Sequence, residues 1–395
     1  MDDLAITTPI TDALVKGAME LEQTVFGRFP HRLPAWARAQ FPDPQLAFVE
    51  AEPSGVRLEF RTTATAIELD VLPTRRELVG APPRPAGVYD FCVDGQVERQ
   101  ESAAAATVLR TNMSSGLVVR EAGTVQTIKF LELASREKLI EIWLPHNEAA
   151  ELSVLRSNAP LHPVKHTGVP RWVHYGSSIS QGSNACSPTG IWPVIASRMV
   201  GMDLMNLGLS GNAMLDPFVA RTIRDTPADL ISLKIGINVV NADVMRARAF
   251  VPAVHGFLDT IREGHPDKPL LLISPIYCPI HEATPGPGAF DLPSLAEGKM
   301  VFRATGLPDE VRAGKLTLSI IREQLKAVVE QRSGRDHSIF YLNGLELFGK
   351  QDHDHFPLPD RLHPCAETHR LMGHRFAPSL GSRWQGLSVA ERQIL

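Results

Sequence analysis

The chain has 395 residues, of which 44% are hydrophobic and 21% charged, and its formal net charge is −4. At roughly 150 residues per domain, this length predicts about two or three domains. The composition excludes a disordered, collagenous or coiled-coil chain. The small net charge and the lack of long basic runs argue against nucleic acid or an acidic membrane as a partner. No apolar stretch approaches the roughly 20 residues that span a bilayer.

Four cysteines stand far apart and form no C-x-x-C pair: Cys92, Cys186, Cys278 and Cys365. Such sparse cysteines favour free thiols over a disulfide scaffold, and we expect Cys186 and Cys365 to be buried thiols. The first residues, Met1-Asp2-Asp3-Leu4, are not followed by the apolar core of a signal peptide. We therefore expect a cytoplasmic protein.

The first part of the chain, from about residue 54 to residue 155, repeats with a period of two. Val56, Leu58 and Phe60 alternate with charged residues, and an Asp94-Gly95 pair follows another alternating run. Alternation of this kind predicts half-buried strands, and Asp-Gly is typical of a tight hairpin turn. Residues 1–165 are therefore predicted to form an antiparallel β-sandwich.

After a proline-containing stretch at residues 158–170, short apolar runs alternate with helical patterns. The expected strands are 172–175, 202–207, 230–235, 270–274 and 339–342, and the expected helices are 192–200, 250–263 and 316–331. Strands that are apolar throughout, separated by helices, predict a parallel sheet covered on both faces. Residues 166–395 are thus an α/β domain, in which the Pro- and Gly-rich stretch 279–306 is expected to be an irregular insertion.

Polar motifs follow the predicted strands, where ligands of α/β sheets bind. They occupy residues 176–182 (GSSISQG), 206–212 (NLGLSGN) and 236–238 (GIN), and a final motif at 360–364 reads DRLHP. Serine-based acyl transfer requires a nucleophile, a base, a carboxylate that orients the base, and donors for an oxyanion. Ser178 is the candidate nucleophile, His363 the base and Asp360 the orienting acid. The backbone N–H groups of Ser178 and Gly211 and the side chain of Asn238 are the candidate oxyanion donors.

Two other motifs allow different interpretations. Asp352-His353-Asp354-His355 contains metal-ligand types, but it lacks a further cluster and is expected to be a solvated loop, so no metal site is assigned. Residues 210–212 (SGN) suggest a phosphate loop, yet the Gly-Lys-Ser/Thr of nucleotide hydrolases does not follow.

The four ordered motifs resemble those of the SGNH, or GDSL-type, hydrolase superfamily, from about residue 172 to residue 373. This resemblance implies a flavodoxin-like three-layer α/β/α domain with the roles given above for Ser178, Gly211, Asn238, Asp360 and His363, and Gly208 is a second candidate for the glycine donor. Two positions depart from the family pattern: Ser177 stands where the namesake motif has Asp, and Val239 follows Asn238 where Asp is usual. Both departures leave the catalytic residues in place.

The N-terminal part resembles the jelly-roll sandwich, similar to carbohydrate-binding modules, of a two-domain branch of this superfamily. The whole chain resembles acyltransferases of that branch that act in tetracycline-type polyketide pathways. This resemblance implies transfer of a salicylyl group from an acyl-CoA co-substrate to a polyketide hydroxyl through an acyl-serine, with small molecules as partners and no other cofactor.

Two alternatives stay open. One is a GDSL-type esterase or deacetylase acting on small or sugar-linked esters, because the same triad hydrolyses an acyl-enzyme when water is the acceptor. The other is a carbohydrate-binding protein whose hydrolase-like domain is inactive.

Overall fold

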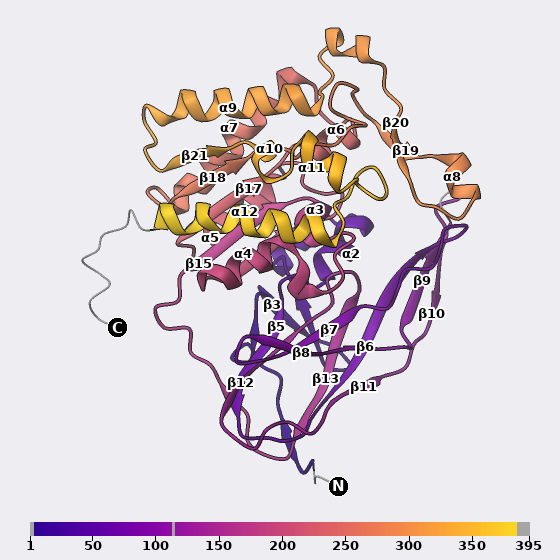
Figure 1. Ribbon diagram of the computed structural model, residues 1–395, viewed down its shortest axis with the longest axis vertical. Helices are drawn as coiled ribbons and strands as arrows, with labels where there is room; N and C mark the ends of the chain where they lie inside the picture. Colours follow the sequence, from indigo (N-terminus) through magenta and orange to yellow (C-terminus); the bar gives the residue numbers. More distant parts are fainter. Residues whose placement is uncertain (1–3, 113–114, 385–395) are drawn as a thin grey trace. The chain divides into compact units, whose positions relative to one another are not determined.

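The structure is a computed structural model that describes residues 4–112 and 115–384 (Figure 1). The chain divides into two compact units. The first comprises Met1–Gly168, Cys186–Thr189 and Pro293–Met300, and the second comprises Val169–Ala185, Gly190–Leu292 and Val301–Leu395. No sequence pattern marks the two short segments that return to the first unit.

The first unit is rich in strands. They are β1 (Ile6–Thr8), β2 (Val15–Lys16), β3 (Glu20–Gln23), β4 (Arg28–His31), β5 (Arg57–Thr62), β6 (Ile67–Leu78), β7 (Val88–Val93), β8 (Gln96–Ser102), β9 (Thr107–Thr111), β10 (Val118–Glu121), β11 (Gln126–Phe130), β12 (Lys138–Trp143), β13 (Ala149–Ser157) and β14 (His162–Pro163), with helices α1 (Ala35–Gln40) and α2 (Pro44–Ala51).

These strands form two sheets. One has the order β10-β9-β6-β13-β4-β3, with β1 paired to β13 and β11 to β6; the other has the order β14-β5-β12-β7-β8, with β2 paired to β5. Neighbouring strands are antiparallel, except for the parallel pair β6–β9. The predicted antiparallel β-rich domain is confirmed.

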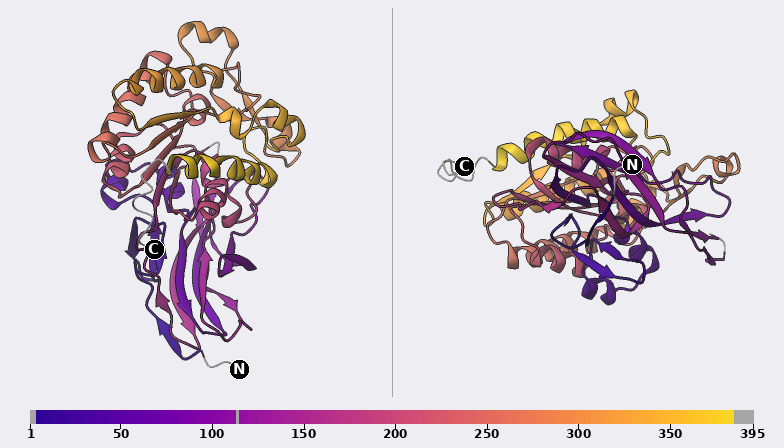
Figure 2. Two further views of the ribbon diagram at one scale, coloured as in Figure 1. Left: turned by 60° about the vertical axis from the view of Figure 1, so that its left-hand side comes forward. Right: turned by 90° about the horizontal axis from the view of Figure 1, so that it is seen from below.

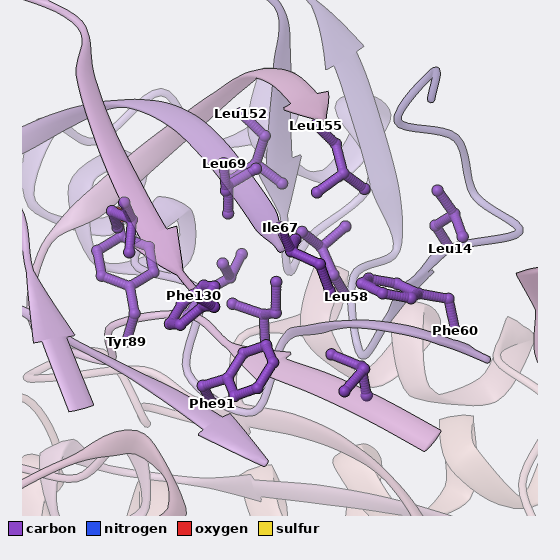
Figure 3. Close-up of a cluster of buried hydrophobic side chains, with 14 of the residues drawn as sticks. Leu14, Leu58, Phe60, Ile67, Leu69, Tyr89, Phe91, Phe130, Leu152 and Leu155 are labelled. Carbon is purple, nitrogen blue, oxygen red and sulfur yellow. The ribbon is translucent and has the colours of Figure 1, made fainter. Parts of the chain in front are cut away.

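A single apolar core lies between the two sheets of this unit (Figure 3). Leu58 and Phe60 of β5 and Phe91 of β7 meet side chains from β6, β11 and β13 of the other sheet. The rings of Phe91 and Phe130 stack with centroids 4.1 Å apart. Burying this much aromatic surface is a main stabilising contribution of the sandwich, since aromatic side chains carry large apolar areas.

Two charged residues of β5 that point away from the core are buried, whereas the alternating sequence pattern predicts that they are exposed. Arg57 and Glu59 alternate with the core residues, yet they are only 6% and 4% exposed. Arg57 Nε donates to a Glu59 carboxylate oxygen at 2.9 Å, and His166 Nε2 lies 2.6 Å from the other Glu59 oxygen. The strand is thus buried on both faces, and charge pairing with hydrogen bonds makes this burial tolerable.

Asp90 of β7 holds the segment Cys186–Thr189 within the first unit. Its side chain is fully buried. One carboxylate oxygen accepts hydrogen bonds from the Ser187 hydroxyl at 2.7 Å, the Thr189 N–H at 2.8 Å and the Thr189 hydroxyl at 2.5 Å. The other accepts from Gln100 at 2.7 Å. Four donors compensate the cost of burying this carboxylate.

The second unit is an α/β domain built on a five-stranded sheet of order β16-β15-β17-β18-β21. The strands are β15 (Arg171–Gly176), β16 (Asp203–Gly208), β17 (Leu230–Lys234), β18 (Leu270–Ile273) and β21 (Ile339–Leu342). All neighbouring pairs are parallel. Numbered along the chain this order is 2-1-3-4-5, the flavodoxin-like order, whose ligand crevice lies where the direction of winding reverses, beside β15.

Helices cover both faces of this sheet. They are α3 (Ser178–Gln181), α4 (Trp192–Val200), α5 (Pro217–Asp225), α6 (Ile237–Asn241), α7 (Ala247–Gly264), α9 (Leu318–Ser333), α10 (Gly344–Leu347), α11 (Lys350–His355) and α12 (Ala366–Trp384). In Figures 1 and 2, α4 and α12 lie on one side of the strands and α7 and α9 on the other. The predicted α/β fold with a parallel sheet is confirmed.

The 279–306 insertion is more regular than expected. It contains the antiparallel pair β19 (Gly288–Phe290) and β20 (Phe302–Ala304), with α8 (Leu292–Ala296) between them in sequence. Each of these strands is only three residues long. Such a strand is too short to show an alternating apolar pattern in the sequence. Among the described residues, no helix combines the length and the hydropathy needed to cross a membrane.

We expect the Asp90→Asn substitution to lower the free energy of unfolding by about 2–4 kcal/mol, because it turns a buried charged acceptor of several donors into a neutral amide. Urea denaturation measures this difference. Glu101→Gln, an exposed change on the neighbouring strand β8, is the matched control and should change stability by less than about 0.5 kcal/mol. Equal effects of the two substitutions would contradict the anchoring role of Asp90.

Candidate active site

The turn between β15 and α3 presents Ser178. Ser177 caps α3, since its hydroxyl accepts a hydrogen bond from the Ile179 N–H at 3.3 Å, and Ser178 is the first residue of the helix. A Cβ atom on Gly176 would lie 2.3 Å from Ser180 Oγ, so this position requires glycine. Ser178 is 8% exposed, which leaves its hydroxyl near the surface while its backbone is held by the turn.

Ser178, His363 and Asp360 form one hydrogen-bonded chain. Ser178 Oγ lies 2.9 Å from His363 Nε2, and His363 Nδ1 lies 2.7 Å from an Asp360 carboxylate oxygen. Both distances fall in the range of a nucleophile, a base and a group that orients the base. The structure therefore brings these three predicted residues together in the predicted order.

The Asp360 carboxylate is held by the loop that carries His363. Its second oxygen accepts from the backbone N–H groups of Leu362 at 2.9 Å and His363 at 2.7 Å. Burial raises the pKa of the Asp360 carboxyl, but the hydrogen bonds and the charge of His363 outweigh it, and the net pKa is lowered. Asp360 is thus an anion at neutral pH, as orienting the imidazole requires.

Two residues that sequence patterns do not reveal support this loop. Asn184, which has a positive φ of 64°, donates its side-chain amide to Asp360 at 3.3 Å. The Cys278 thiol donates to the carbonyl of Arg361 at 3.4 Å. Burial raises the pKa of Cys278 to about 12, so the thiol keeps its proton and stays a donor.

Asn238 lies at the start of α6, directly after β17. Its side-chain oxygen accepts from the Ala213 N–H at 3.0 Å, which fixes the orientation of the amide and leaves its NH₂ group for another acceptor. Gly211 lies in the loop after β16 with a φ of 73°. Asn238 and Ser178 thus follow neighbouring strands of the parallel sheet, and the Gly211 loop is linked to Asn238 through Ala213.

The two glycine candidates differ in their surroundings. The Gly208 N–H donates to the side-chain oxygen of Asn206 at 3.0 Å. A Cβ on Gly208 would lie 2.3 Å from the Gln181 nitrogen, so Gly208 permits close packing of β16 against α3. These contacts give Gly208 a structural role and favour Gly211 as the donor.

A second set of hydrogen bonds joins α3 to the loop after β16. Gln181 accepts from the Ser210 N–H at 2.9 Å, and Asn206 donates to the Ser180 carbonyl at 2.9 Å. Gln181 belongs to the 176–182 motif and Asn206, at the end of β16, to the 206–212 motif. Their placement inside those motifs is the sequence signal that could have identified them.

A neutral histidine lies beneath the nucleophile turn. His174 of β15 is fully buried, with Nδ1 2.7 Å from Ser232 Oγ and Nε2 2.8 Å from Ser180 Oγ. Burial, together with the charge of Lys234, lowers its pKa to about 3. His174 therefore connects β15, β17 and α3 without carrying charge.

The Asp352–His355 motif belongs to a helix, α11, and the predicted loop is wrong. The Asp352 carboxylate pairs with Arg375 at 2.6 Å, and the His353 ring contacts the rings of Tyr277 and Phe348. Helical geometry turns successive side chains to different directions. Within the described ranges, no group of three or more His, Cys, Asp or Glu residues is arranged to hold a metal ion.

The prediction for the two cysteines is also wrong. Cys186 is exposed and Cys365 is half-buried. Cys186 precedes the residues that bind Asp90, and their hydrogen bonds hold the backbone of this segment without burying the thiol. The Cys365 sulfur lies 3.3 Å from the Thr368 hydroxyl.

The model of the GDSL-like lipase/acylhydrolase family matches residues 170–280. This range contains Ser178, Gly211 and Asn238, whereas Asp360 and His363 lie outside it. No curated protein sequence matches the chain.

Among solved structures, the chain is similar to the salicylyl-acyltransferase SsfX3 from a tetracycline biosynthetic pathway. The two are 27% identical, with a TM-score of 0.78, over 97% of this chain and 98% of that one. A protein from Bacteroides ovatus ATCC 8483 assigned as a GDSL-like lipase is 19% identical, with a TM-score of 0.67, over 96% and 97% of the two chains. A family two carbohydrate esterase from Clostridium thermocellum is 15% identical, with a TM-score of 0.52, over 84% and 94%. The last two likenesses concern the fold alone.

The lowered pKa of His174 predicts a loss of stability in acid. In the unfolded chain this imidazole binds a proton as the pH falls through 6.5, while in the folded state it stays neutral down to about pH 3. The unfolded state therefore binds more protons in this window, and stability falls as the pH decreases. Between pH 7 and pH 5 we expect a loss of about 2 kcal/mol from this residue.

Urea denaturation of the wild type and of His174→Gln at both pH values measures this contribution. The substitution removes the titrating group, so the variant should lose about 2 kcal/mol less than the wild type between pH 7 and pH 5. Identical losses would show that His174 binds protons alike in the folded and unfolded states, and would contradict its lowered pKa.

Proposed function

We propose that this chain, a two-domain member of the SGNH, or GDSL-type, superfamily, is a serine acyltransferase that works through an acyl-Ser178 intermediate. The observation that carries the proposal is the hydrogen-bonded chain from Ser178 through His363 to Asp360, with distances of 2.9 and 2.7 Å. The Ser178–His363 distance permits proton transfer between these two groups, and the His363–Asp360 distance permits Asp360 to orient the imidazole.

In the first half-reaction, Ser178 Oγ attacks the carbonyl carbon of the acyl donor while His363 Nε2 accepts the hydroxyl proton. The tetrahedral intermediate then collapses, the bond from carbon to the leaving group breaks, and His363 returns the proton to that group. With an acyl-CoA donor the leaving group is the CoA thiol. Asp360 stabilises the imidazolium that forms between these two transfers.

The negative oxygen of the tetrahedral intermediate needs donors that are fixed before the reaction. The N–H groups of Ser178 and Gly211 and the Asn238 amide are the proposed set. The Ala213–Asn238 hydrogen bond supports this assignment because it holds the Asn238 NH₂ group in one orientation. One such donor typically contributes a factor of about 10²–10³ to kcat.

In the second half-reaction, His363 Nε2 removes the proton of an acceptor hydroxyl, whose oxygen attacks the carbonyl carbon of the acyl-serine. The tetrahedral intermediate collapses, the bond from carbon to Ser178 Oγ breaks, and His363 returns the proton to Ser178 Oγ. An alcohol acceptor gives transfer and water gives hydrolysis. The likeness over 97% of this chain to a salicylyl-acyltransferase from a tetracycline biosynthetic pathway supports a salicylyl or similar aryl acyl group. An acyl-CoA donor and a tetracycline-type polyketide acceptor complete the proposal. Use of acyl-CoA would place the reaction in the cytoplasm.

Labelling with a fluorophosphonate probe tests the nucleophile. We expect the wild type to be labelled at one residue and Ser178→Ala to lose labelling completely, since the probe requires an activated serine. Ser180→Ala, two residues further on the same helix, is the control and should retain labelling. Absence of labelling in the wild type would favour a carbohydrate-binding protein with an inactive hydrolase-like domain.

Product analysis distinguishes transfer from hydrolysis. With salicylyl-CoA and a tetracycline-type alcohol, we expect the ester product to increase with acceptor concentration while free salicylate decreases, because both acceptors compete for one acyl-enzyme. Mass spectrometry of the products measures the ratio, with Ser178→Ala as the blank. If free salicylate is formed alone at every acceptor concentration, the protein is an esterase.

A further inference from the structure

The β19–β20 hairpin of the insertion carries a pair of aromatic residues. Phe290 and Phe302 face each other in the register of the two strands. Their ring centroids are 4.9 Å apart with an interplanar angle of 32°, and both side chains are half-buried. The hairpin therefore holds the Phe302 ring in one place through a neighbour on the paired strand.

Phe302 contacts the base and the acid of the proposed triad at once. Its ring is nearly perpendicular to the imidazole of His363, with centroids 5.6 Å apart and an interplanar angle of 78°. Its backbone N–H donates to the carbonyl of Asp360 at 2.9 Å. Edge-to-face geometry at this distance is a favourable aromatic arrangement.

The base of the hairpin is fixed to the element that carries Asn238. A Cβ on Gly288 would lie 1.9 Å from the Asn241 side-chain oxygen on α6, and a Cβ on Gly286 would lie 1.8 Å from the Val240 carbonyl. Close packing of this kind restricts sliding, because cores and tight backbone contacts deform little. The hairpin thus contacts both α6, which carries Asn238, and the loop that carries His363.

We propose that Phe302 is a positioning residue that holds the imidazole of His363 in the plane required by Ser178 and Asp360. The proposal rests on the proposed function of the triad. The contacts of His363 with Ser178 and Asp360 hold its two ring nitrogens along one axis. If the imidazole ring tilted about that axis, both hydrogen bonds would be poorly aligned. The perpendicular contact with the phenyl ring limits this tilt, and the Phe302 N–H fixes the backbone from which Asp360 projects.

Phe302→Leu tests the ring while keeping the backbone N–H. We expect kcat for ester turnover to fall about 3- to 10-fold, as the loss of one aromatic contact predicts, with KM for the acyl donor changed less than 2-fold. Phe302→Tyr retains the ring and should stay within 2-fold of the wild type. Arg303→Ala, an exposed change on the same strand, should also stay within 2-fold.

NMR spectroscopy tests the role of the Phe302 ring independently of enzyme turnover. The proton between His363 Nδ1 and Asp360 should give a resolved downfield NMR signal in the wild type and in Phe302→Tyr. In Phe302→Leu the signal should broaden through exchange with solvent, because a tilting imidazole exposes this proton.

Several outcomes would overturn the proposal. Unchanged kcat and an unchanged signal in Phe302→Leu would remove the positioning role, and a raised KM with unchanged kcat would assign Phe302 to substrate binding. Equal losses in all three variants would indicate a general distortion of the hairpin. A wild type that shows no turnover refutes the proposed function, and the NMR signals of the variants then decide the positioning role by themselves.

Discussion

The hydrogen bond between Ser178 and His363 joins residues 185 positions apart in sequence. The packing of helices in the second unit keeps these two residues next to each other. Helix α4 begins shortly after the nucleophile turn, and α12 begins shortly after the loop that carries His363. The two helices pack closely: the rings of Trp192 and Phe376 meet edge-on at 5.1 Å, and a Cβ on Gly373 would lie 2.6 Å from the Ile195 side chain. The helix pair thus keeps Ser178 and His363 at the same edge of the sheet.

The sequence predicts the parallel sheet and the order of the four polar motifs because both depend on local patterns. Strands such as 230–235 are short apolar runs, and the first three motifs follow such strands directly. The rule that ligands bind at the carboxyl ends of parallel strands places Ser178, and its pairing with His363 follows from the base that a serine nucleophile requires. Helices such as Pro217–Asp225 and Ala366–Trp384 are missed, although Asp216 and Pro217 form a helix-start signal; in Ala366–Trp384 an internal proline, Pro378, interrupts the helical pattern.

Features that depend on tertiary contact escape the sequence patterns. Arg57 and Glu59 alternate with core residues as exposed residues do, and only their pairing with each other and with His166 permits burial. Phe302 stands in a stretch of low regularity, and its role arises from a hairpin whose strands are three residues long. Asn184 supports Asp360 from a turn that has no distinguishing composition. Such contacts are set by three-dimensional packing, which one sequence does not encode as a periodicity.

Ser177 occupies the position that is Asp in the namesake motif of the superfamily, and it caps α3 through its hydroxyl. An aspartate cap loses its acceptor charge on protonation, whereas a serine hydroxyl keeps its lone pairs at every pH at which the protein folds. The cap beside Ser178 consequently adds no titrating group to this turn, whereas an aspartate in its place would add a second carboxylate next to the hydroxyl.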